Sequence, residues 1–249
     1  MVNARQAAYL QALGVDVYVP RSAPPATVPV TRRAAAAAEP VPAVASAAPA
    51  DIARDLDWDA LRAAVAACQR CELHGTRTQT VFGVGDRQAR WMFIGEAPGA
   101  EEDRQGEPFV GRAGQLLTSM LRALGLQRED VFIANVLKCR PPGNRDPKPS
   151  EAVSCRTFLE RQVALVNPTL VIAVGRIAAQ NLLATETPIA KLRGKVHAFG
   201  ARSWPLLVTY HPAFLLRSPS EKRKAWQDLL QARQLFERLR READSGGPA

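Results

Sequence analysis

Three polar residues with chemically useful side chains each follow an apolar segment of the chain. Glu96 lies in the segment GEAPG, Asn135 ends the segment VFIAN, and His211 lies in the segment TYHPAFLL. A carboxylate can position a water, an imidazole can stabilise developing charge, and an Asn side chain pairs one acceptor with one N–H₂ donor. Taken singly, such an Asn is more often a turn residue, and the His is only a modest catalytic signal. Together they indicate acid–base chemistry joined to recognition of a base or amide edge.

Four carboxylates crowd the glycine-rich stretch that contains Glu96, the others being Glu101, Glu102 and Asp103. Glycine-rich turns often bring backbone amides close to phosphates, but neither the Walker pattern nor the dinucleotide fingerprint is present here. Because four acids would repel a phosphate, the stretch favours a neutral or electropositive reacting centre. An acidic surface loop would explain Glu101 and Asp103, but it explains poorly a Glu between Gly95 and Pro98.

The four cysteines are Cys68 and Cys71 in a C-x2-C pair, then Cys139 and Cys155. This is the ligand count of a tetrahedral zinc site or of a four-cysteine iron–sulfur cluster, and spacing alone does not separate the two metals. Four unrelated buried thiols are the remaining alternative.

Surface chemistry points toward a polyanion. Lys and Arg total 33 against 24 Asp and Glu, a net charge of +9. Such an excess favours binding to phosphates, although each cation can equally be a solvated surface charge. The apolar run Phe214-Leu215-Leu216 precedes Arg217 and looks too exposed for a loop, whereas a wedge entering a base stack needs that composition. The other candidate phosphate contacts are Lys138, Arg140, Arg145, Lys148 and the run Lys222-Arg223-Lys224.

Apolar segments alternate with helical patterns over the rest of the chain. Strands are expected at 91–94, 131–136, 170–174 and 206–210. Helices are expected at 58–68, 113–124, 150–166 with Ser150 as its cap, 176–183, and 221–241 with apolar Trp226, Leu229, Leu230 and Leu235. Fully apolar strands that alternate with helices indicate an α/β fold with a parallel sheet covered on both faces. Ligands bind at the carboxyl ends of such strands, which is where Glu96, Asn135 and His211 lie.

Composition divides the 249 residues into three parts. Residues 21–50 contain 12 Ala and 6 Pro and are expected to form a disordered linker. Residues 1–20 resemble a short docking peptide that orders on a protein partner, with a frayed end as the alternative. Residues 51–249 are expected to form the folded domain. No segment is apolar enough to cross a membrane and no secretory signal is recognisable, so we expect a cytoplasmic protein.

The order of motifs resembles one known family. C-x2-C, GEAPGAEED, GEPFVGRAG, IANVLKCRPPGNRDPKPSE, a fourth Cys and TYHPAFLL follow one another as in the family 4, or iron–sulfur, uracil-DNA glycosylases. The similarity covers about residues 55–240. It implies a three-layer α/β/α fold with a central four-stranded parallel sheet, and a monofunctional enzyme that hydrolyses uracil from single- and double-stranded DNA as a monomer. It also implies that Cys68, Cys71, Cys139 and Cys155 bind a [4Fe–4S] cluster rather than zinc.

The resemblance also implies a role for each matching residue. Glu96 would place the attacking water or stabilise the cationic sugar, and His211 would stabilise charge on uracil O2 as the base leaves. Phe109 would stack on the flipped uracil, and Asn135 would hydrogen-bond its edge and reject cytosine. Three further residues complete the assignment: Gly95 for backbone contact to uracil, Glu102 for support of the pocket, and Leu215 as the wedge that fills the gap in the DNA.

Two related branches and two other classes of protein define the alternatives. Branch members that become trapped on uracil carry a His-containing loop after the second strand, whereas this chain has no His between Cys139 and Cys155, so turnover is expected. Family 5 enzymes lack the Glu of GEAPG, so a preference for uracil is expected. A non-catalytic metal–cysteine nucleic-acid-binding module would not need three chemical groups at three strand ends. A redox protein is disfavoured by the absence of a flavin or nicotinamide motif.

Overall fold

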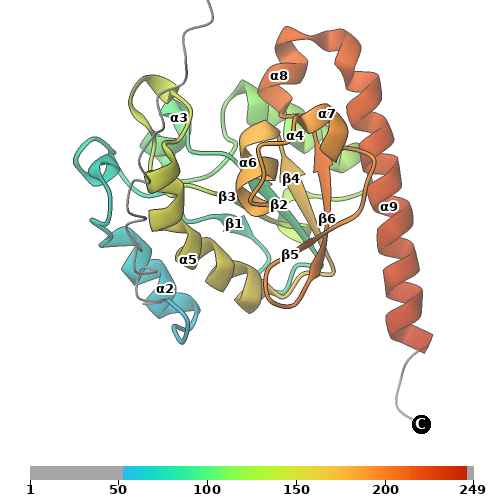
Figure 1. The fold of residues 1–249 in the computed structure, drawn as a ribbon, viewed down its shortest axis with the longest axis horizontal. Coiled ribbons are helices and arrows are strands. Elements are labelled where there is room, and N and C mark those ends of the chain that lie inside the picture. Colours follow the sequence, from blue (N-terminus) through green and yellow to red (C-terminus); the bar gives the residue numbers. More distant parts are fainter. Residues whose placement is uncertain (1–52, 246–249) are drawn as a thin grey trace, which may run out of the picture. The chain divides into compact units, whose positions relative to one another are not determined.

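The computed structural model describes residues 53–245, and its centre is a six-stranded sheet (Figure 1). The strand order is β1-β3-β2-β4-β6-β5. The four central strands run parallel, and the two edge strands pair antiparallel to them. The strands are β1 Val84–Gly85, β2 Trp91–Gly95, β3 Phe132–Asn135, β4 Leu170–Val174, β5 His197–Phe199 and β6 Trp204–Thr209. The expected four-stranded parallel sheet is confirmed, and the edge strands β1 and β5 are additions to it.

Helices flank both faces of the sheet (Figure 1). The α-helices are α2 Trp58–Ala66, α3 Ala100–Gln105, α4 Arg112–Ala123, α5 Pro149–Val166, α6 Arg176–Leu182, α7 Ile189–Leu192, α8 Pro212–Arg217 and α9 Lys222–Ser245. Short 3₁₀ turns are η1 Glu72–Gly75, η2 Arg128–Asp130, η3 Pro142–Asn144 and η4 Pro219–Glu221.

Strand β2 lies in the middle layer of the fold and packs against helices on both of its faces. Its side chains alternate between the two faces, as in any strand. Met92 and Ile94 pack in one apolar cluster with residues of α2, α5 and α6. Trp91 and Phe93 pack in a second cluster with residues of α4 and α9. Because both faces are covered, every residue of β2 is buried, which explains why the strand is apolar throughout.

The parallel register brings the functional motifs to one edge of the sheet. Gly95 at the end of β2 pairs with Asn135 at the end of β3, and Val174 at the end of β4 pairs with Thr209 at the end of β6. The residues that follow these strands therefore emerge side by side. This alignment confirms the expectation that Glu96, Asn135 and His211 lie at the carboxyl ends of three different strands.

One local expectation, the cap of α5, is wrong, and α9 buries only part of its apolar residues. Helix α5 is not capped by Ser150: it begins at Pro149, and the Glu151 carboxylate accepts the backbone N–H of Lys148 at 2.7 Å, a cap that uses the first-turn acid instead. On α9, Trp226 and Leu230 do not join the core but are 39% and 40% exposed. A 24-residue helix that packs along one side of a sheet buries only one stripe, which here contains Leu229 and Leu235.

None of the helices within residues 53–245 is long and apolar enough to span a membrane. The predicted docking peptide at 1–20 and the predicted linker at 21–50 lie outside the described residues.

Candidate active site

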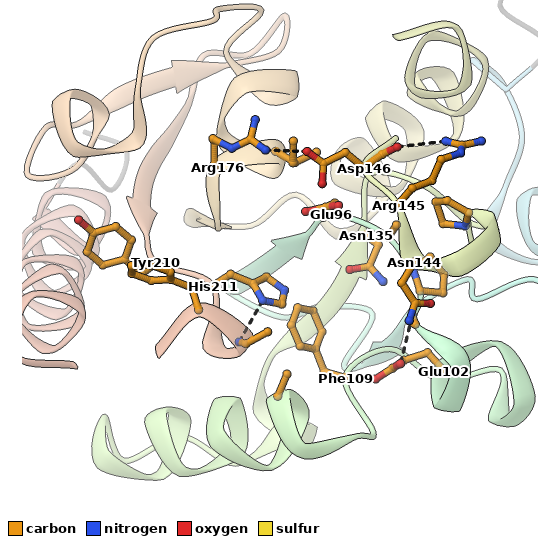
Figure 2. Close-up of a pocket in the computed structure, with 18 of the residues that line it drawn as sticks. Glu96, Glu102, Phe109, Asn135, Asn144, Arg145, Asp146, Arg176, Tyr210 and His211 are labelled. Atoms are coloured by element: carbon orange, nitrogen blue, oxygen red, sulfur yellow. Dashed lines mark hydrogen bonds and ion pairs between the residues drawn. The ribbon is translucent and has the colours of Figure 1, made fainter. Parts of the chain in front are cut away.

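A pocket of about 650 Å³ opens at the carboxyl edge of the parallel strands (Figure 2). Glu96, Phe109, Asn135 and His211, which come from four separate segments of the chain, all line it. Glu102, Arg145 and Arg217 line it as well, so seven of the residues singled out in the sequence meet at one place.

Glu96 is held beside Asn135 by an extension of the sheet. Beyond the last paired residues of β2 and β3, the backbone N–H of Val136 donates to Gly95 O at 2.9 Å and that of Leu137 donates to Glu96 O at 3.0 Å. The pKa of the Glu96 carboxyl is raised to about 7: burial is the largest cause, the charge of Asp146 adds to it, and the charge of Arg176 opposes both. A carboxyl group whose pKa is near 7 can accept a proton from a water molecule.

Asn135 presents an acceptor that the protein leaves free. Its side chain is only 2% exposed, and its Oδ1 has no hydrogen-bond partner among the described residues. Gly95 is what leaves room there, because a Cβ on Gly95 would lie 2.4 Å from Asn135 Oδ1 and 2.5 Å from Phe109 Cζ. Buried polar atoms are nearly always paired, so an unpaired acceptor in a pocket indicates a donor on the ligand.

Phe109 is held in a strained backbone conformation at a φ of 55°. Glu102 holds it: its carboxylate accepts the backbone N–H groups of Gly99 at 3.1 Å, Val110 at 3.0 Å and Gly111 at 3.2 Å. Gly114 permits the close packing, since a Cβ there would lie 1.7 Å from Phe109 O. The contacts of Glu102 are therefore those of a residue that ties two loops together, which is the support expected of it.

His211 is set up as a neutral hydrogen-bond donor. Its Nδ1 accepts the backbone N–H of Ala213 at 3.1 Å, which places the proton on Nε2. Burial lowers the pKa of the imidazole to about 4, with Arg217 adding to the effect. The ring lies 5.6 Å from the Phe109 ring, centroid to centroid, so the donor stands next to the aromatic surface.

The apolar run after His211 is not an exposed loop. Residues 212–217 form α8, and Leu215 is 1% exposed in a cluster with Tyr210 and Ala225. Leu216 is the exposed member of the run, at 36%. The helix turns successive residues to different sides, so the predicted wedge position Leu215 faces the protein interior.

Some predicted surface charges also lie elsewhere. Lys138 is 1% exposed and donates from Nζ to Asn135 O at 2.8 Å and to Gln162 Oε1 at 2.6 Å, so it does not contact phosphate. Asp103 is 4% exposed and accepts the backbone N–H of Thr78 at 3.0 Å, so it is not part of an acidic surface. In both cases the charged side chain forms a hydrogen bond with a backbone group inside the protein, and the number of charges in the sequence does not reveal such a contact.

The sequence analysis missed several residues of the pocket. Asn144, Asp146, Arg176 and Tyr210 line it. Arg176 Nη2 pairs with Asp146 Oδ2 at 2.6 Å. Arg176 directly follows Gly175 after β4. The rule that ligands bind at the carboxyl ends of parallel strands therefore applied to this residue as well. Asp146 lies in the predicted loop after β3 and gave no such signal.

A second and much smaller cavity, of about 10 Å³, is lined by Cys68, Cys71, Cys139 and Cys155. It shares no lining residue with the pocket. Arg77 Nη1 lies 3.1 Å from Cys139 Sγ. Within residues 53–245, no three Cys, His, Asp or Glu side chains converge closely enough to hold one metal ion. The four predicted ligands thus surround one space without meeting at a point.

Comparison with known proteins gives concordant results. The sequence model of the uracil DNA glycosylase superfamily matches residues 82–230. A type-4 uracil-DNA glycosylase of Archaeoglobus fulgidus is 48% identical over 161 residues, which is 62% of this chain and 81% of that protein. Type-4 enzymes of Thermotoga maritima, at 45% over 62% of this chain and 81% of the relative, and Pyrobaculum aerophilum, at 40% over 70% and 92%, are also similar. With its motifs in the same order along a three-layer fold, the chain belongs to the type-4 branch of the uracil-DNA glycosylase superfamily.

Proposed function

We propose that this protein is a DNA-repair enzyme that removes uracil from DNA by hydrolysing its N-glycosidic bond and leaves an abasic site. The observation that carries the proposal is the meeting, in one pocket, of a free amide acceptor, an aromatic ring, a neutral imidazole donor and a carboxyl of raised pKa. The relatives named above are uracil-DNA glycosylases, and membership of their family supports the same reaction here.

Asn135 and Phe109 account for recognition of the base. The free Oδ1 of Asn135 suits the N3–H donor of uracil, while its N–H₂ group can donate to uracil O4. Cytosine offers an acceptor at N3 and an amine at C4, so both contacts would fail. A site built to hydrogen-bond its substrate strongly rejects an analogue that leaves buried polar groups unpaired. Phe109, held in advance by Glu102, supplies the surface on which the base stacks.

Glu96 and His211 account for the chemistry. Cleavage of the bond creates a cationic, oxocarbenium-like sugar and an anionic base. The neutral His211 donates from Nε2 to uracil O2, where negative charge collects. Glu96, once ionised, faces the cationic sugar and accepts a proton from the attacking water. The proton stays on the Glu96 carboxyl, the water oxygen forms the new bond to the sugar carbon, and the electron pair of the broken bond leaves with the uracil anion.

The base reaches the pocket only after it leaves the duplex. A side chain must then occupy the gap in the stack, and the exposed Leu216 suits this task better than the buried Leu215. Arg217 and the exposed residues Lys222 and Arg223 lie next along the chain and can neutralise phosphates. Single strands need no such wedge, so the proposal extends to single-stranded DNA.

The cysteine cavity supports a [4Fe–4S] cluster. Its donors are four thiols, the ligand set of such clusters. A single zinc ion needs its sulfurs about 2.3 Å from one point, whereas a cluster of four irons spreads its ligands further apart, which agrees with four thiols around a common space. When bound, the cluster would cross-link three parts of the domain. Cys68 and Cys71 lie between α2 and η1, Cys139 follows β3, and Cys155 lies on α5. No catalytic step needs it.

The proposal for the whole chain has three parts. Residues 51–249 form the catalytic domain, 21–50 a linker, and 1–20 a peptide that docks on a protein partner. We propose that the enzyme acts as a monomer, because all the groups that the reaction needs come from one chain. We also propose that it works in the cytoplasm.

The test is excision by the purified protein on an oligonucleotide that carries one uracil. Abasic sites are scored by alkaline cleavage against identical strands that carry thymine or cytosine. We expect cleavage at uracil only. Protein that binds DNA but leaves uracil in place would indicate the non-catalytic nucleic-acid-binding module instead.

A further inference from the structure

An ion pair lines the pocket beside Glu96 and has no role in the reaction as described so far. Asp146 comes from the segment after η3, and Arg176 begins α6, thirty residues later. Their side chains meet at 2.6 Å, and both belong to the lining of the pocket (Figure 2).

Both partners are anchored by further contacts. Arg145 Nη2 pairs with the buried Glu151 carboxylate at 2.6 Å, and its Nη1 donates to Asp146 O at 3.0 Å, so the segment that carries Asp146 is tied to α5. Arg176 also donates to Gln180 Oε1 one turn along α6, at 3.2 Å. The geometry of the pair is therefore set by contacts with two helices, α5 and α6.

Stability alone does not account for this pair. The side chains of Arg176 and Asp146 are 50% and 64% exposed. Ion pairs this exposed contribute roughly 0–1 kcal/mol to folding. What distinguishes the pair from the other exposed pairs of the described chain is its position beside a half-buried carboxyl.

Few other charges act on Glu96. Glu102 is engaged by three backbone N–H groups, Arg145 is paired with Glu151, and His211 is neutral above pH 4 or so. Arg217 acts on His211. Burial is the largest influence on the pKa of Glu96, and the two charges that add to it with opposite sign are those of Asp146 and Arg176. The charge of each partner thus offsets the effect of the other on the pKa of Glu96.

We propose that the Asp146–Arg176 pair controls the ionisation of Glu96 and so sets the lower pH limit at which the enzyme works. The two residues act through Glu96 rather than on the substrate, and are therefore positioning residues. This inference rests on the proposed role of Glu96 in the excision of uracil.

The sign of each expected change follows from charge. Arg176→Gln removes a cation that favours ionised Glu96 and exposes Asp146, so Glu96 should ionise only at higher pH. Asp146→Asn removes an anion and frees Arg176, so Glu96 should ionise at lower pH. Each shift should be about half a pH unit to one pH unit at low ionic strength, and salt should reduce it. The double variant restores a neutral environment, and Arg176→Lys keeps the charge.

The experiment is the pH profile of single-turnover uracil excision by the complete protein between pH 5 and pH 9. We expect the acid limb to move up for Arg176→Gln and down for Asp146→Asn, and to return close to the parent for Asp146→Asn/Arg176→Gln and for Arg176→Lys. Arg233→Gln and Glu237→Gln are matched controls, because they break an ion pair of similar exposure on α9, away from the pocket. Neither control should move the limb.

Two outcomes would overturn the inference and are distinct from failure of the proposed function. If both single variants move the limb in the same direction, or neither moves it while Glu96→Gln is inactive, the pair does not control Glu96. If Glu96→Gln is as active as the parent, the role proposed for Glu96 fails, and the inference fails with it.

Discussion

The pocket and the cysteine cavity are built from adjacent stretches of chain but in opposite ways. Asn135 and Cys139 are four residues apart, yet one lines an open pocket of about 650 Å³ and the other a closed space of about 10 Å³. The pocket holds an unpaired acceptor, a carboxyl of raised pKa and a strained Phe109. The cavity is closed by thiols and neighbouring side chains, among them Val65 and Phe158.

The difference between the two regions shows that the pocket contains interactions that are unfavourable for folding. Unpaired and strained groups cost stability, and they persist where function requires them. The pocket contains the unpaired Asn135 Oδ1 and the strained Phe109, whereas Cys139 and Cys155 belong to the larger apolar cluster of the domain and Cys68 and Cys71 pack against it. Substitutions in the two regions should therefore affect activity and stability in different combinations, and the predictions below test that contrast.

The largest effect should come from Glu96→Gln and His211→Ala. Each removes a group that we propose to act in the reaction, so we expect single-turnover excision to fall by about 10²–10⁴-fold. The visible absorbance and iron content of the purified protein should stay at parent values, because neither residue lines the cysteine cavity. Loss of the cluster in either variant would show that the two regions are not separate.

The next largest effect should come from Cys155→Ala. Loss of this proposed ligand should release the proposed cluster and lower the thermal midpoint by about 10 °C, because metal binding and folding are coupled. Iron analysis, absorbance and calorimetry measure it. The control is Ser154→Ala, the neighbouring residue that lines the same cavity. If Cys155→Ala kept its iron, or if Ser154→Ala lost it, the ligand assignment would be wrong.

A smaller effect concerns the stability cost of the pocket: Glu96→Gln should stabilise the protein at pH 8. Because the folded-state pKa of Glu96 is raised to about 7, the folded chain binds more protons than the unfolded chain between about pH 4.5 and 7. Stability from this group therefore falls as pH rises through that window, and Gln, which does not ionise, avoids the loss. We expect a thermal midpoint a few degrees above the parent at pH 8 and no gain at pH 4. An equal change at both pH values would contradict the burial argument.

The smallest effect should come from deleting residues 1–50. Both regions lie within residues 53–245, so excision from naked DNA should stay within about twofold of the parent. Initial rates on a uracil oligonucleotide measure it. An inactive but folded truncated protein would place part of the active site before residue 51.

The main strands and the motifs at their ends could be predicted because each strand is a continuous apolar run closed by polar residues. The edge strands β1 and β5 could not, since two and three residues carry no period and their pairing depends on neighbours. Composition also failed to separate Leu215 from Leu216, because only the direction of the helix decides which is buried. The Asp146–Arg176 pair escaped prediction because it joins two segments that only the fold brings together.

The unpaired acceptor of Asn135 has a consequence for turnover. A buried acceptor without a partner costs roughly 1–3 kcal/mol, and any ligand with a suitably placed imide N–H relieves that cost. Uracil keeps its N3–H after the bond to the sugar is cut. The released base therefore remains a good ligand for the empty pocket, and we expect free uracil to act as a competitive product inhibitor while cytosine, which has no N3–H, does not. The atom that we propose to select the substrate should thus slow the enzyme wherever its product accumulates.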